Sequence, residues 1–163
     1  TNSFEAPYLR DVTIECADSI LMATTSAPLV EQEGVDGAAT FQRQLTWHGD
    51  RNFYQGFDGD SFWRISDQND PDESERLSFL DWVSHWGQQQ EYLPSWGEIA
   101  WKKLPAADRP VHARTPEDYA LAEEPKGNMA RNGASDGRDV GFYAATLPVL
   151  AEARPAVPAA ASR

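Results

Sequence analysis

The chain has 163 residues, of which 40% are hydrophobic and 11% aromatic, so its composition is that of a packed domain and not of a disordered protein. Its 26 acidic and 14 basic residues give a formal net charge of -12, which repels nucleic acid and anionic lipid headgroups. The sequence has no apolar run near the roughly 18 to 20 residues of a membrane span. We therefore expect no nucleic-acid partner and no membrane insertion.

Cysteine and histidine are too sparse for the common metal centres. Cys16 is the sole cysteine in the sequence, so an internal disulfide cannot form and zinc sites with two thiolates are excluded. His48, His85 and His112 are far apart in the sequence. We expect no metal and no cofactor, and we interpret Cys16 as a small buried apolar residue.

Short strands separated by turn residues are expected across residues 9–66. In the first strand, Val12 and Ile14 alternate with polar neighbours, which is typical of a strand with one buried face. Two further strands are predicted at Ile20–Ala23 and Leu29–Gln32, each bounded by small or polar residues.

These three strands recur further along the chain. Shifting the sequence by 33 positions places Val12 on Leu45, Ile14 on Trp47, Ile20 on Phe53, Leu21 on Tyr54, Leu29 on Phe62 and Val30 on Trp63. In a solenoid, equivalent strands of neighbouring repeats pair in parallel and stack their apolar side chains. An antiparallel sandwich is the alternative, because evenly spaced short strands would give a similar pattern.

A helix is predicted after this repeat. Asp70 offers an N-cap and Pro71 a first helical residue, and apolar residues at helical spacing follow. Gly87 can end the helix in the left-handed conformation. We expect a helix from Pro71 to Trp86 that covers the solenoid.

The rest of the chain is richer in proline and less periodic. One strand is expected at Glu98–Leu104, and Thr115-Pro116-Glu117-Asp118 predicts a single helical turn that ends near Leu121. Residues 151–163 are mostly Ala, Pro and Arg, which is typical of a frayed tail. The expected division is β-solenoid coils at 1–66, a covering helix at 67–87, an irregular capping segment at 88–150 and a disordered tail at 151–163.

Several segments carry a resemblance to a known family. They are Thr46-Trp47-His48-Gly49, Asn52-Phe53-Tyr54-Gln55-Gly56, Thr115-Pro116-Glu117-Asp118-Tyr119-Ala120-Leu121, Ser135-Asp136-Gly137-Arg138-Asp139-Val140-Gly141 and Leu147-Pro148. Together they resemble the C-terminal region of right-handed parallel β-helix proteins of the pectin-lyase-like kind, common among planctomycete-type bacteria. The resemblance implies a mainly β fold: the terminal coils of a right-handed parallel β-helix with a covering α-helix and an irregular C-terminal cap. Because these families are largely uncharacterised, it implies no catalytic residue.

Tryptophan supplies the candidate binding residues. The sequence has six, and exposed aromatic rings are what sugar-binding faces use. Trp47 and Trp63 fall on core positions of the repeat, whereas Trp96 and Trp101 lie in the irregular segment. We therefore predict Trp96 and Trp101 as ligand-binding residues on an exposed platform.

Carboxylates are numerous but do not form a recognisable catalytic or metal motif. The acidic run from Asp67 to Glu75 lacks the spacing of an EF-hand, so we interpret it as the start of a helix, with a divalent-cation site as the alternative. Lyase chemistry requires a basic residue near a carboxylate, and Asp11 with Arg10 and Arg43 on one face could meet this requirement. The sequence indicates such a site only weakly.

The sequence leans against an enzyme without deciding the question. We expect the non-catalytic C-terminal part of an extracytoplasmic β-solenoid, secreted, periplasmic or on the cell surface. It would act as a scaffold or bind a neutral glycan or a protein surface, and it would continue into the rest of the solenoid upstream of Thr1. Two alternatives stay open: the tail of a polysaccharide lyase or hydrolase with its active site upstream, and the sensor region of a multidomain signalling kinase.

Overall fold

The computed structural model describes residues 11–35, 37–70, 72, 74–103, 110, 113–123 and 128–141. Within them the strands are β1 (Val12–Ala17), β2 (Ile20–Met22), β3 (Val30–Gly34), β4 (Leu45–Asp50), β5 (Phe53–Gln55), β6 (Trp63–Asp67), β7 (Glu75–Leu77), β8 (Glu91–Tyr92) and β9 (Ser95–Trp96). The helices are α1 (Ala38–Gln44), α2 (Phe79–Gln90) and the 3₁₀ helix η3 (Pro116–Tyr119).

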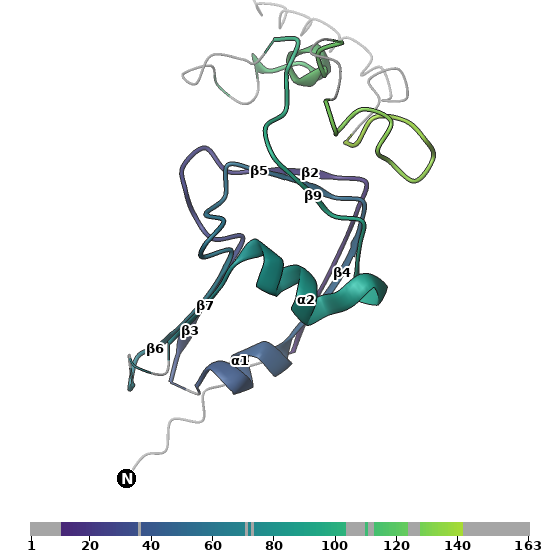
Figure 1. The fold of residues 1–163 in the computed structure, drawn as a ribbon. Helices are drawn as coiled ribbons and strands as arrows, with labels where there is room; N and C mark the ends of the chain where they lie inside the picture. Colours follow the sequence, from purple (N-terminus) through teal and green to yellow (C-terminus); the bar gives the residue numbers. More distant parts are fainter. Residues whose placement is uncertain are drawn as a thin grey trace, which may run out of the picture.

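The strands form three sheets of three strands each. The orders are β1-β4-β8, β2-β5-β9 and β3-β6-β7. Figure 1 shows the sheets on three sides of the molecule, with α2 crossing between the β3-β6-β7 side and β4. None of the helices in the described part of the chain is long and apolar enough to cross a membrane.

The predicted pairing of the repeated strands is confirmed. β1 pairs with β4, β2 with β5 and β3 with β6, all in parallel and with partners 33 residues apart, as in Val12 with Leu45. The antiparallel alternative is therefore wrong for these three pairs. Apolar residues at every second position explain the register, because a slip of one residue would turn the buried face of each strand to solvent.

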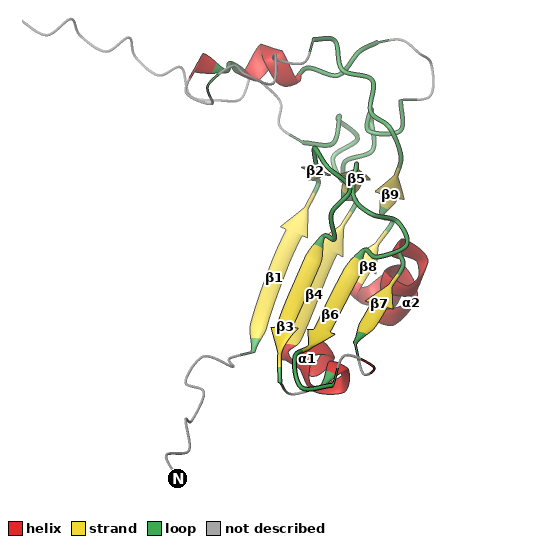
Figure 2. Ribbon diagram, turned by 90° about the vertical axis from the view of Figure 1, so that its left-hand side faces the viewer, coloured by secondary structure: helices red, strands yellow, loops and turns green. Residues whose placement is uncertain are grey.

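The predicted fold class is wrong. The described residues do not form a parallel β-helix covered by a helix; they form three small sheets, of which the third is mixed, with two α-helices. The strand that overturns the prediction is β7, which pairs with β6 in the antiparallel direction through Trp63 and Leu77 (Figure 2). The next parallel partners of β4 and β5, which are β8 and β9, do not follow at the same 33-residue offset. The reason is that α2 is inserted before them in the sequence.

Aromatic side chains fill the space between the sheets. The fully buried side chains of this aromatic core include Trp47, Tyr54, Phe62, Trp63 and Trp82. The Trp82 ring lies edge-on to its neighbours, at a centroid distance of 5.2 Å from Trp47 and 5.5 Å from Trp63, an arrangement that adds to the burial of apolar area.

The inward positions of the first strands are only partly covered. Ile14, Leu21 and Leu29 are partly buried against this core, as expected. Val12 was expected to stack with them, but it is 50% exposed.

Helix α2 begins later than predicted. Its N-cap is Ser78, whose side chain accepts a hydrogen bond from the Asp81 amide, while the Asp81 carboxylate accepts one from the Ser78 amide. Asp70 therefore does not cap this helix, because the residues before Ser78 form β7. Gly87 has a φ of 63° and interrupts the helix, which agrees with the break expected there.

Helix α1 was not predicted. It covers one end of the core, where Phe41 and Ala38 are buried (Figure 1). Its last turn is tied to β3 by Gln32, whose Nε2 donates to the Phe41 carbonyl at 3.0 Å. The Gln32 Oε1 accepts from Trp63 Nε1 at 2.8 Å, so this amide connects α1, β3 and β6.

The segment after β9 lies beyond the β2-β5-β9 sheet in both ribbon views (Figures 1 and 2). It has a second, smaller core in which Ile99, Ala130 and Val140 pack with Phe53. The helical turn predicted at Thr115-Pro116-Glu117-Asp118 is confirmed as η3.

The strand predicted at Glu98–Leu104 is not found within its described part, where an isolated antiparallel bridge joins Trp101 to Leu121. The predicted tail, 151–163, lies outside the described residues.

A long-range contact fixes this segment to the first strands. The Ser135 amide donates to the Asp18 carboxylate at 2.7 Å, and the Ser135 hydroxyl donates to the same carboxylate. The Gly141 amide donates to the Asp18 carbonyl at 2.7 Å, with Gly141 at a φ of 101° against Ile20. Gly141 therefore permits a close approach of the two backbones.

Candidate functional site

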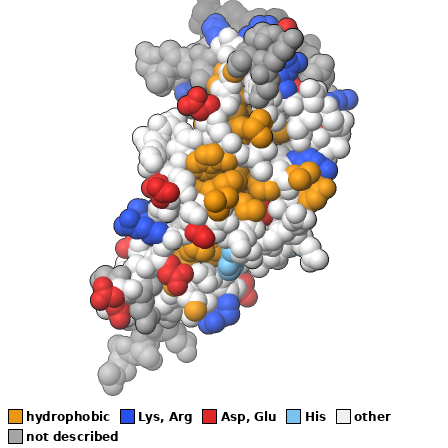
Figure 3. Space-filling view, in the orientation of Figure 1, with side chains coloured by type: hydrophobic (Ala, Val, Ile, Leu, Met, Phe, Trp, Pro, Cys, Tyr) orange, Lys and Arg blue, Asp and Glu red, His pale blue; other side chains and the backbone are white. Residues whose placement is uncertain are grey.

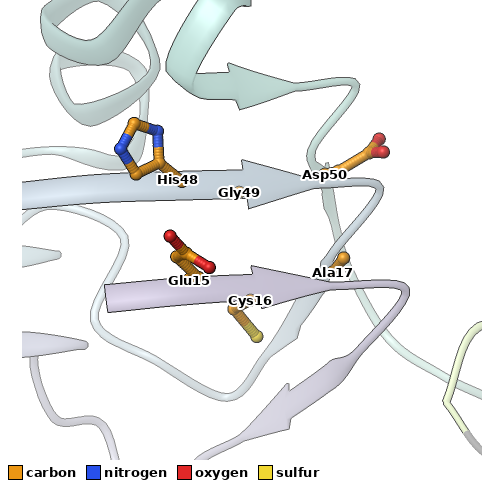
Figure 4. Close-up of a pocket in the computed structure, with 6 residues that line it drawn as sticks. All are labelled: Glu15, Cys16, Ala17, His48, Gly49 and Asp50. Atoms are coloured by element: carbon orange, nitrogen blue, oxygen red, sulfur yellow. The ribbon is translucent and has the colours of Figure 1, made fainter. Parts of the chain in front are cut away.

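The outer face of the β1-β4-β8 sheet carries carboxylate, imidazole and aromatic side chains that solvent can reach. The parallel register places Glu15 beside His48, and Ala17, Asp50 and Tyr92 in one row across the three strands. Paired residues in a sheet project to the same side, so these side chains share the face that points away from the core. Figure 4 shows Glu15 and His48 projecting from one side of β1 and β4.

A groove runs along this outer face. It has a volume of about 350 Å³ and is lined by Glu15, Cys16, Ala17, His48, Gly49 and Asp50. The Cys16 sulfur points to the opposite side from the Glu15 carboxylate in Figure 4, in keeping with its partial burial against the core. The groove therefore presents carboxylate and imidazole groups.

An exposed aromatic ring lies in the same row of residues. Tyr92 is 41% exposed, and the Arg51 guanidinium lies 5.0 Å from the centre of its ring. Arg51 also donates to both carboxylate oxygens of Asp50, at 3.0 and 3.3 Å. The Arg51 guanidinium thus lies over one face of the Tyr92 ring and pairs with Asp50, so a ligand could stack only on the other face of the ring.

The two carboxylates of the groove differ in their surroundings. Asp50 is neutralised by Arg51, whereas Glu15 has no hydrogen bond or ion pair within the described residues. The partner of Glu15 in the register is His48 rather than a Lys or Arg. Together with the net charge of -12, this leaves the groove attractive to neutral and cationic ligands and repulsive to anions.

A second carboxylate group lies under the same sheet, on its inner side. Glu91 is 1% exposed and accepts hydrogen bonds from Trp47 Nε1, from the Tyr54 hydroxyl at 3.1 Å and from Trp82 Nε1 at 3.4 Å. Burial raises the pKa of Glu91, against the opposing effect of these donors. Burial and the nearby carboxylate also raise the pKa of Tyr54.

This inner cluster ties together four elements, because its donors come from β4, β5 and α2 and Glu91 begins β8. Glu91 is shielded from solvent, and the backbone of β4 separates it from the outer face. We therefore assign Glu91 a structural role beneath the outer face.

The acidic run after β6 is structural. The Asp67 carboxylate accepts from the Asn69 and Asp70 amides at 2.7 and 3.0 Å, and these bonds lower its pKa. Asp81 lies in the cap of α2, and its bonds to Ser78 lower its pKa too. Across the described residues, no group of three or more His, Cys, Asp or Glu side chains is arranged to hold a metal ion.

The structure does not bring the predicted ligand residues Trp96 and Trp101 together. Trp96 is half-buried on β9, where its ring lies 5.0 Å from Phe79 and 5.5 Å from Phe62. Trp101 is half-buried in the second core, with its ring 6.4 Å from Tyr119, and its indole nitrogen has no hydrogen-bond partner among the described residues. Their role in binding stays a prediction, but the two rings do not form one platform.

Apolar side chains form a separate surface over α2. Figure 3, in the orientation of Figure 1, shows them gathered where α2 crosses the molecule. Leu80 is 75% exposed on α2, and Leu93 is 56% exposed just after β8. This surface offers few polar groups that could exchange hydrogen bonds with a sugar.

Sequence reasoning missed Tyr92 and Arg51. Arg51 precedes the turn into β5 and has a φ of 49°, which brings its backbone amide to the Tyr92 carbonyl at 2.8 Å. The feature that could have indicated an exposed Tyr92 is the alternation in β8, where Glu91 is buried and Tyr92 is exposed. A strand of two residues is too short for such alternation to be recognised.

No protein-family model, curated protein or solved structure matches this chain. The resemblance to pectin-lyase-like proteins therefore has no support from these comparisons and stays a prediction, and the site has to be interpreted from its own geometry.

Proposed function

We propose that the chain is a non-catalytic binding module whose outer face of the β1-β4-β8 sheet binds a glycan without acidic groups. The observation that carries this proposal is the exposed Tyr92 ring, which the register places beside Asp50 at the groove and of which Arg51 covers one face. An aromatic ring packs against the apolar face of a pyranose, and neighbouring charged groups can exchange hydrogen bonds with its hydroxyls.

The same groups are poorly suited to bond cleavage. Hydrolysis of a glycoside requires one carboxyl group that stays protonated, and active sites achieve this by shielding it from water. Glu15 is exposed and the Asp50 side chain is 42% exposed and paired with Arg51. These groups therefore suit the binding of a sugar better than its cleavage. A neutral glycan, the ligand expected from the sequence, is one of the glycans without acidic groups that we propose as ligands.

The test is titration of the purified chain with neutral and acidic oligosaccharides, followed by calorimetry. We expect neutral sugars to bind and polyuronates to bind weakly or not at all. Tyr92→Ala should weaken binding about ten-fold or more, because aromatic rings at the centre of an interface supply much of its free energy. Leu80→Ala, which truncates a more exposed apolar side chain on α2, is the control.

The result that would overturn the proposal is unchanged affinity in Tyr92→Ala with loss of affinity in Leu80→Ala. It would move the binding surface to α2 and indicate a protein partner. Turnover of any of these sugars by the chain would contradict the non-catalytic part of the proposal. The extracytoplasmic location expected from the sequence agrees with a glycan ligand and stays a prediction.

A further inference from the structure

Glu15 differs from the other exposed carboxylates on paired strands. Glu31, at the same kind of outward position on β3, forms an ion pair with Arg64 of β6, and Asp50 forms one with Arg51. Glu33 accepts a hydrogen bond from Gln68 at 3.1 Å. Glu15 has no such bond within the described part of the chain, yet it lines the groove.

The position of this carboxylate relative to the aromatic ring sets the length of a ligand that could contact both. Glu15 on β1 and Tyr92 on β8 are separated by two strand spacings across the sheet and two residues along it. With the usual spacing of strands and residues, this corresponds to about 12 Å between their backbones. That distance matches two linked hexose units, with the groove between the two contact points.

We propose that the outer face of the β1-β4-β8 sheet binds an oligosaccharide of amino sugars with free amines. One pyranose ring packs on the face of Tyr92 that Arg51 does not cover, and the ammonium group of a neighbouring unit pairs with Glu15. This proposal rests on the proposed function and narrows its ligand class. The net charge of -12 supports it, since the field of the protein attracts a cationic ligand in addition to the local ion pair.

The experiment compares three tetrasaccharides that differ in one group: glucosamine, N-acetylglucosamine and glucose oligomers. Calorimetric titrations are run near pH 6, where the amines are protonated, at low and at physiological salt. We expect the glucosamine oligomer to bind about three- to five-fold more tightly than the other two, as an exposed ion pair provides. Higher salt should reduce that advantage, because screening weakens it.

Two variants test whether the Glu15 carboxylate causes the preference for the glucosamine oligomer. Glu15→Gln should abolish the preference for the glucosamine oligomer over the glucose oligomer, because the amide carries no charge. Glu33→Gln removes the same charge from an exposed position on β3 and should keep the preference. If Glu33→Gln and Glu15→Gln reduce it equally, the preference comes from net charge alone and the assigned contact is wrong.

The two proposals fail in different ways. Equal binding of all three oligomers, with a loss in Tyr92→Ala, would overturn the amino-sugar inference and leave the glycan-binding function standing. Absence of binding by all three oligomers and by other neutral sugars would overturn both. A tighter fit of the N-acetylated oligomer would also overturn the inference, because that ligand carries no ammonium group.

Discussion

Gly49 lies directly over the Glu91 carboxylate, so that even a single methyl group on Gly49 would overlap it. Gly49 and Glu91 are paired across β4 and β8, with Glu91 on the inner side of the sheet. The same methyl group would also overlap Trp47 Nε1, which donates to Glu91. The lack of a side chain at Gly49 is therefore what lets the carboxylate and its indole donor meet under the groove.

Gly49→Ala should destabilise the protein by about 1 to 3 kcal/mol, the usual cost of forcing an extra methyl group into a packed core. Urea denaturation followed by circular dichroism measures the free energy of unfolding. Gly59→Ala is the matched control, since its new methyl group would lie 3.5 Å from Trp96, an ordinary contact. Equal stability of the two variants would show that the Glu91 carboxylate moves aside without loss.

The pKa of Glu91, raised above its ordinary value of 4.5 by burial, predicts a pH dependence. The folded state favours the protonated acid, so the stability that Glu91 contributes is fully present below the ordinary pKa. It is lost as the pH rises through the folded-state pKa. We expect Glu91→Gln, which cannot ionise, to lose less stability than the wild type as the pH rises above 4.5.

The measurement is the difference in the free energy of unfolding between wild type and Glu91→Gln at a series of pH values. Asp67 and Asp81 have lowered pKa values, so their contribution is present above the ordinary aspartate pKa and lost in acid. Both the wild type and Glu91→Gln keep Asp67 and Asp81, so the contribution of these two groups cancels when the two free energies of unfolding are subtracted. If this difference does not change with pH, the pH dependence of stability does not come from Glu91.

Two substitutions distinguish the observed start of α2 from the one expected from the sequence. Ser78→Ala should destabilise by about 1 kcal/mol, because the Asp81 amide loses its acceptor. Asp70→Ala should change stability by no more than about 0.5 kcal/mol, as an exposed loop residue does. Thermal denaturation of the two variants gives the ranking. The opposite order would restore Asp70 as the cap.

The two predicted ligand tryptophans should differ in their effect on folding. Trp96→Ala should cost about 2 to 3 kcal/mol, less than a fully buried ring, because Trp96 packs on Phe62 and Phe79 at the edge of the main core. Trp101→Ala should cost less, since Trp101 packs in the smaller cluster. Chemical denaturation tests this order. An unchanged stability in Trp96→Ala would instead support an exposed role for that ring.

The strand register was predictable because side-chain alternation and the 33-residue repeat act together. Val12 with Leu45 and Ile20 with Phe53 align on sequence grounds, and their backbones pair as expected. The fold class was not predictable from the same repeat, since the third strand of the β3-β6-β7 sheet runs antiparallel. Two matching repeats do not determine the direction of the next strand.

The helix start was misplaced because capping signals are local. Asp70 and Pro71 have the residue types of a helix start, yet the strand after them forms hydrogen bonds with β6. Tertiary pairing outweighed the local preference, and Ser78, with Asp81 three residues later, forms the actual capping box.

The candidate site could be predicted only in part. Glu15 and His48 lie in strands whose register the repeat gives. Tyr92 joins them through β8, after the repeat has been interrupted by α2, so no periodic signal connects it to Asp50. Sequence reasoning instead selected Trp96 and Trp101, which the cores partly cover.

The spacing of the parallel pairs has a consequence during synthesis. Every pair among the first six strands joins residues 33 positions apart, so no ladder can form from neighbouring residues. Such non-local topologies fold in milliseconds to seconds once the chain is complete. A ribosome adds roughly 5 to 20 residues per second, so the stretch that separates β1 from β4 takes about two to seven seconds to appear. For that time the edges of β1, β2 and β3 that pair with β4, β5 and β6 stay open, and these edges are where a chaperone would protect the growing chain.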